Sequence, residues 1–118
     1  MTDRELASAE MARTTFQRKA VARQPADAVL DGAVSFFIER GYRSARTGRP
    51  NQVFVMGGRE GSLPRVTAEI LVQPNVGKAK VTMVTISGFG EQLSGHLADY
   101  AASLRNKTAP AVDEESTG

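Results

Sequence analysis

The sequence contains no cysteine and no tryptophan, and it has one histidine in 118 residues. Without cysteine the chain has no disulfide, no thiolate metal ligand and no cysteine nucleophile. A single histidine excludes a histidine-rich metal site. No apolar run approaches the roughly 18–20 residues that cross a bilayer, and the N-terminus lacks the apolar stretch of a secretory signal. We therefore expect a cytoplasmic protein with no transmembrane segment, no metal and no cofactor.

Large apolar residues are scarce at both ends of the chain and concentrate between residues 26 and 104. Only the middle of the chain can therefore build a core. This distribution predicts a weak helical or disordered extension over 1–24, a single domain over 25–106 and a disordered tail over 107–118. Within the extension, Thr2 and Glu5 fit a capping box, which marks the start of a helix.

Charge is unevenly distributed, although the net charge is only +2. Residues 40–65 hold six arginines and one acid, Glu60. A local positive field of this kind attracts polyanions. Nucleic-acid binding is therefore one hypothesis, and an ordinary solvated surface is the alternative. The candidate anion-binding residues are Arg43, Arg46, Arg49, Arg59 and Arg65.

Residues 25–40 carry the clearest helix pattern. Pro25 suits the first helical position, and Gly41 suits the left-handed residue that ends a helix. Gly32 lies inside the helix, which indicates either close packing against a neighbour or simple tolerance. The apolar positions repeat at steps of three and four residues and build one wide face; they are Val29, Leu30, Ala33, Phe36 and Phe37.

Four extended segments follow the helix. They cover residues 42–47, 52–56, 65–73 and 78–87, with a turn expected at 74–77. Short links between consecutive strands indicate antiparallel neighbours in meander order. A leucine stripe at helical spacing then predicts a last helix over 90–106. Together these elements predict an α+β two-layer sandwich, in which helices cover one face of a four-stranded antiparallel meander.

Both faces of this predicted sheet carry apolar side chains. In each of the last three strands, some apolar residues occupy the parity opposite to the main apolar set, and the last strand changes phase along its length. Either a bulge returns these side chains to one core, or they form a second apolar surface. A soluble monomer rarely leaves such a surface open. The candidate interface residues are Phe54, Met56, Leu71, Val84 and Ile86.

The sequence gives only weak candidates for phosphate-binding, metal-binding or catalytic residues. The loop 57–62 is rich in glycine and holds an arginine, but it lacks a phosphate-binding signature and reads as a flexible hairpin loop. His96 has no second histidine or cysteine to share a metal. Asp27 and Asp31 lie one helical turn apart, where they either hold a cation or form a solvated face. We therefore expect no catalytic residue and no enzyme, because every candidate lacks a partner.

The leading hypothesis is a small non-enzymatic binding or assembly module. It would act through an apolar sheet face, either as a homodimer or with a protein partner. The occupant of that face is left open between residues 1–24, a second copy of the chain and a ligand. Two further hypotheses are a nucleic-acid-binding protein that uses the arginines of residues 40–65 and a carrier of a small apolar ligand.

Overall fold

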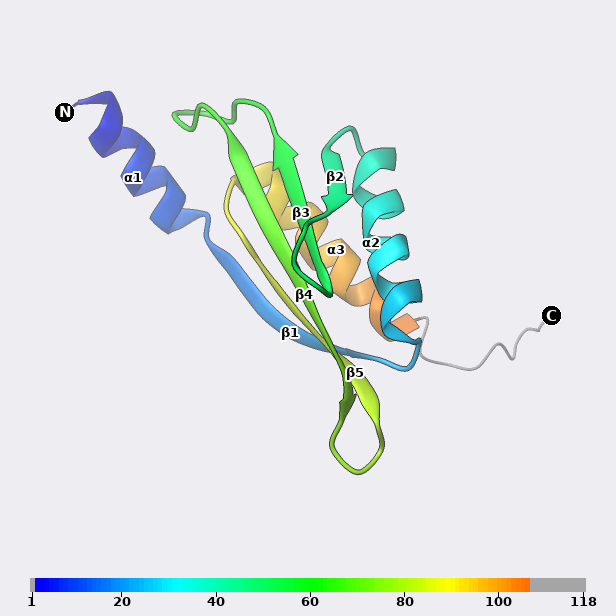
Figure 1. Ribbon diagram of the computed structural model, residues 1–118. Helices are drawn as coiled ribbons and strands as arrows, with labels where there is room; N and C mark the ends of the chain where they lie inside the picture. The colour runs from blue at the N-terminus through cyan, green and yellow to red at the C-terminus, as the bar shows by residue number, and fades with distance from the viewer. Residues whose placement is uncertain (1, 107–118) are drawn as a thin grey trace.

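The computed structural model describes residues 2–106, which form three helices and a five-stranded sheet (Figure 1). The predicted tail over 107–118 lies outside the described residues. No helix in the part of the chain that is described is long and apolar enough to cross a membrane. The helices are α1 (Asp3–Arg13), α2 (Ala26–Glu39) and α3 (Glu91–Asn106), and the strands are β1 (Phe16–Ala22), β2 (Arg43–Arg46), β3 (Gln52–Gly57), β4 (Val66–Val76) and β5 (Val81–Gly88).

The sheet is antiparallel throughout and has the order β1-β5-β4-β3-β2. The meander of β2 to β5 is the one predicted from the four extended segments. The helices α2 and α3 pack on one face of the sheet, and their apolar sides meet the inward side chains of the strands. The predicted α+β two-layer sandwich with flanking helices is therefore confirmed.

The sequence predicts four strands, and the structure has a fifth. Residues 16–22 form β1, which pairs with β5 from Phe16 opposite Gly88 to Ala22 opposite Thr82. The expectation of a loose extension over 1–24 is wrong for this segment. Because β1 is an edge strand, its backbone pairing with β5 holds it in place, and only Ala22 among its side chains is fully buried. The sequence of β1 therefore shows almost no alternation of apolar and polar residues.

The helix α1 begins with the predicted capping box. Thr2 accepts the backbone N–H of Glu5, and the Glu5 carboxylate accepts the N–H of Thr2. These hydrogen bonds lower the pKa of the Glu5 carboxyl. None of the residues of α1 is fully buried. The helix therefore projects from one end of the sheet and adds little to the core (Figure 1).

The apolar face predicted for α2 is the one that is buried, since Val29, Leu30, Ala33 and Phe37 all lie in the core. Two details differ from the prediction. Pro25 is the N-cap residue, with extended backbone angles, rather than the first helical residue. A side chain at Gly32 would meet no atom within 4 Å of its Cβ, so close packing does not explain this glycine.

The turn between β4 and β5 lies three residues later than predicted, at residues 77–80. Pro74 and Asn75 belong to β4, where the register with β5 shifts between Gln73 and Val76. An irregularity of this kind accommodates a proline, which has no N–H for the ladder. The left-handed backbone of Gly77 and Lys80 then closes the hairpin.

Candidate functional site

The uncovered face of the sheet lies opposite α2 and α3. On β3, Val53 and Val55 point into the core, so Phe54 points to the other side. On β4, Ile70 is buried, and its neighbour Leu71 shares the uncovered face. Phe54 is 38% exposed and Leu71 is 39% exposed. They are diagonal neighbours, because Phe54 pairs with Glu69 and Leu71 pairs with Gln52. Two apolar side chains within contact range of each other therefore face solvent.

Two of the five candidate interface residues lie on the opposite face. Val84 and Ile86 are completely buried in the core beneath the helices, so their assignment to a second surface is wrong. The misleading signal is Thr82, which also points inward and breaks the apolar alternation of β5. Its hydroxyl donates to the backbone oxygen of Gln24 at 2.7 Å, so this buried polar group is satisfied. Phe54, Met56 and Leu71 remain on the uncovered face.

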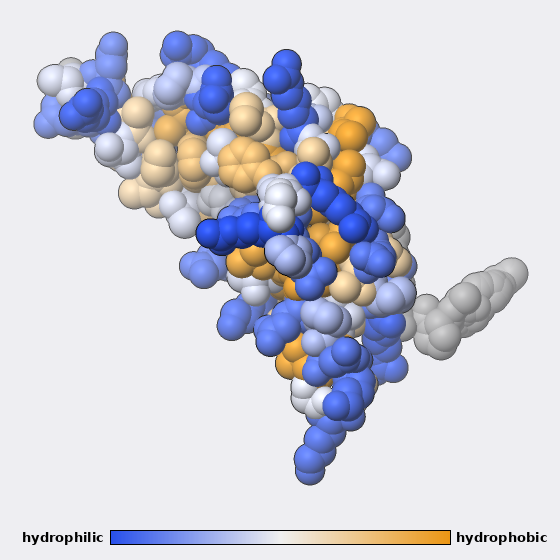
Figure 2. Space-filling view, viewed as in Figure 1, coloured by the Kyte–Doolittle hydropathy of each residue, from blue (hydrophilic) through white to orange (hydrophobic). Residues whose placement is uncertain are grey.

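The uncovered face extends across β5 to β1, which sequence reasoning missed. Val21 is 42% exposed and pairs with Met83 of β5, which adds a second apolar pair at the far edge of the sheet. Polar residues separate the two pairs, and Lys19 and Glu69 contribute charges of both signs. Figure 2 shows this mixed character, with apolar atoms between charged side chains. No amphipathic signal marks Val21, because β1 is mostly polar.

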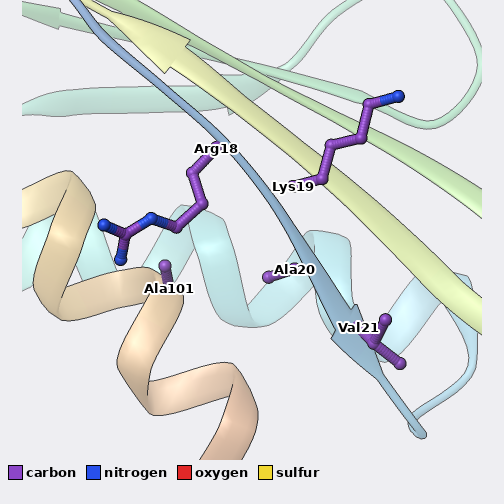
Figure 3. Close-up of a pocket in the computed structure, with 5 residues that line it drawn as sticks. All are labelled: Arg18, Lys19, Ala20, Val21 and Ala101. Carbon is purple, nitrogen blue, oxygen red and sulfur yellow. The ribbon is translucent and has the colours of Figure 1, made fainter.

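The free edge of β1 is protected by charge. A hollow of about 520 Å³ lies beside it and is lined by Arg18, Lys19, Ala20, Val21 and Ala101 (Figure 3). Arg18 points toward α3 and Lys19 points to the other side of the sheet. Charged side chains on an edge strand oppose the addition of another strand. The face of the sheet is therefore better suited than its edge to a contact with another molecule.

The five candidate anion-binding arginines do not form one cluster. Arg46 is bound by α2, because its guanidinium lies 2.9 Å from the Asp31 carboxylate, 3.4 Å from that of Asp27 and 3.1 Å from the Asp27 backbone oxygen. The cation that Asp27 and Asp31 hold is therefore Arg46 itself. Arg43 is opposite Met56 on the uncovered face, Arg49 and Arg65 are exposed in the segments beside β3 and β4, and Arg59 lies beside α1.

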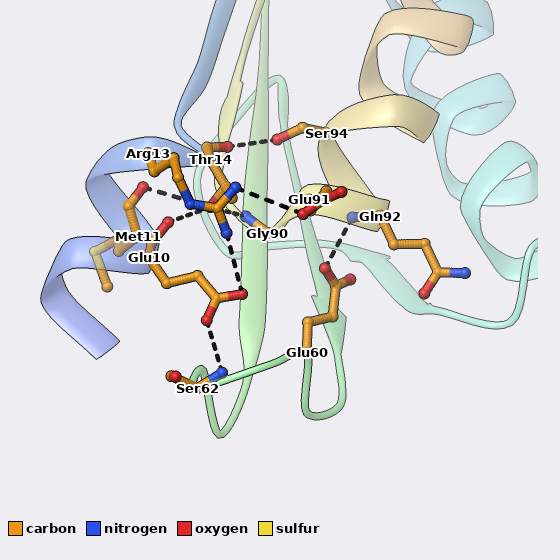
Figure 4. A network of polar contacts seen from close by, with 10 residues as sticks. All are labelled: Glu10, Met11, Arg13, Thr14, Glu60, Ser62, Gly90, Glu91, Gln92 and Ser94. Atoms are coloured by element: carbon orange, nitrogen blue, oxygen red, sulfur yellow. Dashed lines mark hydrogen bonds and ion pairs between the residues drawn. The ribbon is translucent and has the colours of Figure 1, made fainter. Parts of the chain in front are cut away.

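The loop 58–65, between β3 and β4, has a structural role that the sequence did not reveal. Its Glu60 carboxylate accepts the backbone N–H groups of Gln92 and Leu93, at 2.9 and 3.2 Å, in the first turn of α3 (Figure 4). A helix N-terminus attracts negative charge, and here the chain's own carboxylate supplies it. The loop is thus anchored at Glu60 rather than freely flexible. Burial, together with the negative charge of Glu60, raises the pKa of Tyr42 nearby.

A second set of contacts ties α1 to the same place. The Glu10 carboxylate accepts the backbone N–H of Ser62 at 2.7 Å. The Thr14 hydroxyl accepts the N–H of Gly90 at 2.9 Å, and Ser94 donates to the Thr14 backbone oxygen. Figure 4 shows these contacts converging from three segments that are distant in sequence. Glu10, Thr14 and Ser94 are therefore engaged in contacts within the chain.

His96 of α3 lines a hollow of about 810 Å³ together with Glu10, Glu60, Glu91 and Asp99. Its Nδ1 is buried without a hydrogen bond, and its ring packs edge-on against Tyr42 at 5.5 Å between centroids. Across residues 2–106, no group of three histidine, cysteine, aspartate or glutamate side chains could hold a metal ion.

Removing the Glu60 cap should weaken the attachment of α3. We expect Glu60→Ala to lower the free energy of unfolding by about 0.5–2 kcal/mol, because two amides of α3 lose their acceptor. The pKa of Tyr42 should also fall, since the carboxylate charge that raises it is gone. Denaturant unfolding and spectroscopic titration measure the two effects. Glu91→Ala is the matched control, because that exposed carboxylate is in the first turn of the same helix but pairs with the Arg13 side chain, at 3.6 Å. Equal losses from both variants would contradict the cap.

The sequence matches no protein-family model and no curated protein sequence. Among solved structures, the chain is similar to the crystal structure of DR_A0006 from Deinococcus radiodurans, at 15% sequence identity and a TM-score of 0.44. The similarity covers 80% of this chain and 98% of that chain. The function of this chain is therefore inferred from its own residues.

Proposed function

We propose that this protein is a small non-enzymatic assembly module that forms a homodimer through the uncovered face of its sheet. The observation that carries the proposal is the exposure of Phe54 and Leu71, which are diagonal neighbours on adjacent strands, on a face that α1, α2 and α3 leave uncovered. Val21 is exposed on the same face. Burying such side chains contributes roughly 25 cal/mol for each Å² of apolar surface that leaves water.

A second copy of the chain fits this face better than a charged partner does. Two sheets stack face to face about 10 Å apart when apolar side chains interdigitate between them. A two-fold axis places the same face against itself. The face carries Arg43 and Lys19 as well as Glu69, so a rotated copy offers charges of the opposite sign. A partner of one charge would meet both attraction and repulsion.

The remaining polar groups support a role in assembly rather than catalysis. Glu60 and Glu10 accept backbone N–H groups within the chain. Asp27 and Asp31 bind Arg46. A general acid or base needs a partner group and access to substrate, and these carboxylates serve the fold instead.

Light scattering after size-exclusion chromatography tests the dimer directly. We expect the unaltered protein to have twice the mass of the chain at micromolar concentration. The double variant Phe54→Lys, Leu71→Lys should have the mass of one chain, with an unchanged circular dichroism spectrum, because like charges would then oppose each other across the two-fold axis.

The matched control for this test is Ile38→Lys. Ile38 is 54% exposed on α2, away from the uncovered face, and the control variant should remain a dimer. A monomeric unaltered protein would defeat the proposal. Loss of the dimer in the Ile38 variant alone would move the contact to the helical layer and would defeat it too.

A further inference from the structure

The strands β4 and β5 continue past the rest of the sheet as a two-stranded ribbon (Figure 1). The pairing of β3 with β4 reaches only to Leu71, and the pairing of β1 with β5 reaches only to Thr82. Residues 74–81 lie beyond both positions, and their strand pairing is within the hairpin, with Val76 opposite Val81. At roughly 3.3 Å per residue, the ribbon extends about 13 Å from the sheet.

The ribbon itself carries only positive charge. Lys78 and Lys80 are exposed at its tip, and none of residues 74–81 is acidic. Val76 and Val81 are half-buried opposite each other, so an apolar cross-strand pair stabilises the ribbon next to the two lysines.

An exposed arginine lies on each side of the ribbon where it leaves the sheet. Arg23 directly follows β1, whose pairing with β5 ends at Thr82. Arg49 belongs to the turn between β2 and β3, and this turn contacts β4, because the Asn51 carbonyl accepts the Val72 N–H at 2.9 Å. The two arginines are therefore on opposite sides of the ribbon, one beside β5 and the other beside β4.

Carboxylates are scarce around these four cations. Aspartate and glutamate are absent from the three segments that build this end of the sheet, residues 70–90, 15–24 and 47–53. The acids that come next along the chain have partners, since Arg46 binds Asp27 and the Gln52 side chain donates to Glu69. Within residues 2–106, this end of the sheet therefore presents positive charge to solvent, and a positive surface of this kind attracts a polyanion.

The dimensions of the ribbon match the major groove of B-form DNA. Paired strands lie about 4.8 Å apart, and the groove is about 12 Å wide, so it admits a two-stranded ribbon. The groove is about 8.5 Å deep, so a projection of about 13 Å enters it before the sheet meets the duplex. The major groove of A-form RNA is too narrow for such an element.

We propose that this ribbon binds in the major groove of duplex DNA, with Lys78 and Lys80 contacting the phosphates that border the groove and with Arg23 and Arg49 contacting the phosphate backbones on either side. Contacts of this kind position a protein on DNA without reading its sequence. The proposal goes beyond the assembly role, because Phe54 and Leu71 lie outside the ribbon. One proposal can therefore fail while the other holds.

Fluorescence anisotropy of a labelled DNA duplex of about 20 base pairs tests the proposal with the full chain. Four phosphate contacts give a slope of about −3.6 for the logarithm of affinity against that of salt concentration, so affinity should fall about 150-fold between roughly 50 and 200 mM salt. The double variant Lys78→Gln, Lys80→Asn should bind more weakly at 50 mM salt and lose only about 12-fold over that range, because its slope is halved. Asparagine suits position 80, where φ is +56°.

Arg4→Glu is the matched control, because it lowers the net charge by the same amount as the double variant. Arg4 is exposed on α1, at the other end of the sheet from the ribbon, and its replacement should leave affinity and salt dependence unchanged. An RNA duplex of the same sequence is the matched probe, and it should bind the unaltered protein more weakly than DNA does.

The proposal is overturned if the unaltered protein does not bind the DNA duplex at about 50 mM salt, or if the lysine variant keeps the affinity and slope of the unaltered protein. Equal weakening by Arg4→Glu, or equally tight binding of the RNA duplex, would show a general attraction to polyanions and would overturn it too. Circular dichroism checks that each variant folds. The comparison of DNA with RNA uses the unaltered protein, so it decides the matter even if the lysine variant does not fold.

Discussion

Replacing Ile86 with alanine should lower the free energy of unfolding by about 2–5 kcal/mol, the range measured for large-to-small changes in protein cores. Ile86 is completely buried on the helix-covered face of β5, and it is opposite Ile70 of β4, which is also completely buried. Truncation removes apolar contacts and leaves a cavity that the surrounding core residues fill only in part. Denaturant unfolding, with the slope of the transition compared between variants, measures the loss.

Leu71→Ala is the matched control for Ile86→Ala. Both residues are large aliphatic side chains on central strands, but Leu71 is 39% exposed on the uncovered face. We expect its replacement to change the stability of the monomer by no more than about 0.5 kcal/mol. A large loss from Leu71→Ala at a protein concentration where no dimer forms would show that the two faces have been assigned the wrong way round.

Leu71 and Ile86 also show what strand periodicity can and cannot predict from the sequence. Strand periodicity correctly divides β4, since Val66, Ala68, Ile70 and Val72 are all buried and Leu71 is not. The same reasoning fails on β5, because an inward threonine looks polar in sequence although the Gln24 carbonyl satisfies it. A hydrogen bond between residues 58 positions apart leaves no local trace in the sequence.

The missed strand β1 has a related cause. Edge strands are held by backbone hydrogen bonds, and backbone groups are the same in every residue, so Gln17, Arg18 and Lys19 carry no strand signal. The helix α2 was predictable because its burial depends on side chains at a regular spacing. The candidate site follows the same division. Strand parity identifies Phe54 and Leu71 on well-patterned strands, whereas the place of Val21 depends on how β1 pairs with β5, a segment distant in sequence.

Among exchanges of glycine for alanine at the junction of β5 and α3, Gly90→Ala should lower the free energy of unfolding most. The backbone of Gly90 has φ of +109°, a conformation that residues with a Cβ rarely adopt. Forcing alanine into such a region costs about 1–3 kcal/mol. The new Cβ would also lie 2.5 Å from Cγ1 of Val66, a buried core residue, and overpacking of this kind adds about 1–3 kcal/mol.

The position of Gly90 makes relaxation difficult. Its N–H donates to the Thr14 hydroxyl at 2.9 Å, and its carbonyl accepts the N–H of Ser94 at 2.7 Å. A shift that relieves the contact with Val66 therefore disturbs the start of α3 and its connection to α1. We expect thermal and denaturant unfolding to show a combined loss of about 2–5 kcal/mol.

Gly32→Ala is the opposite case and serves as the control. The same chemical change there adds a methyl group to a helix interior with no atom within 4 Å of the new Cβ. Alanine is favoured over glycine in helices by about 0.8–1 kcal/mol, so this variant should be more stable than the unaltered protein. Two identical substitutions would then move stability in opposite directions, because backbone angle and contact require glycine at position 90, whereas Gly32 occupies an ordinary helical position. A stabilising Gly90→Ala, or a destabilising Gly32→Ala, would contradict that distinction.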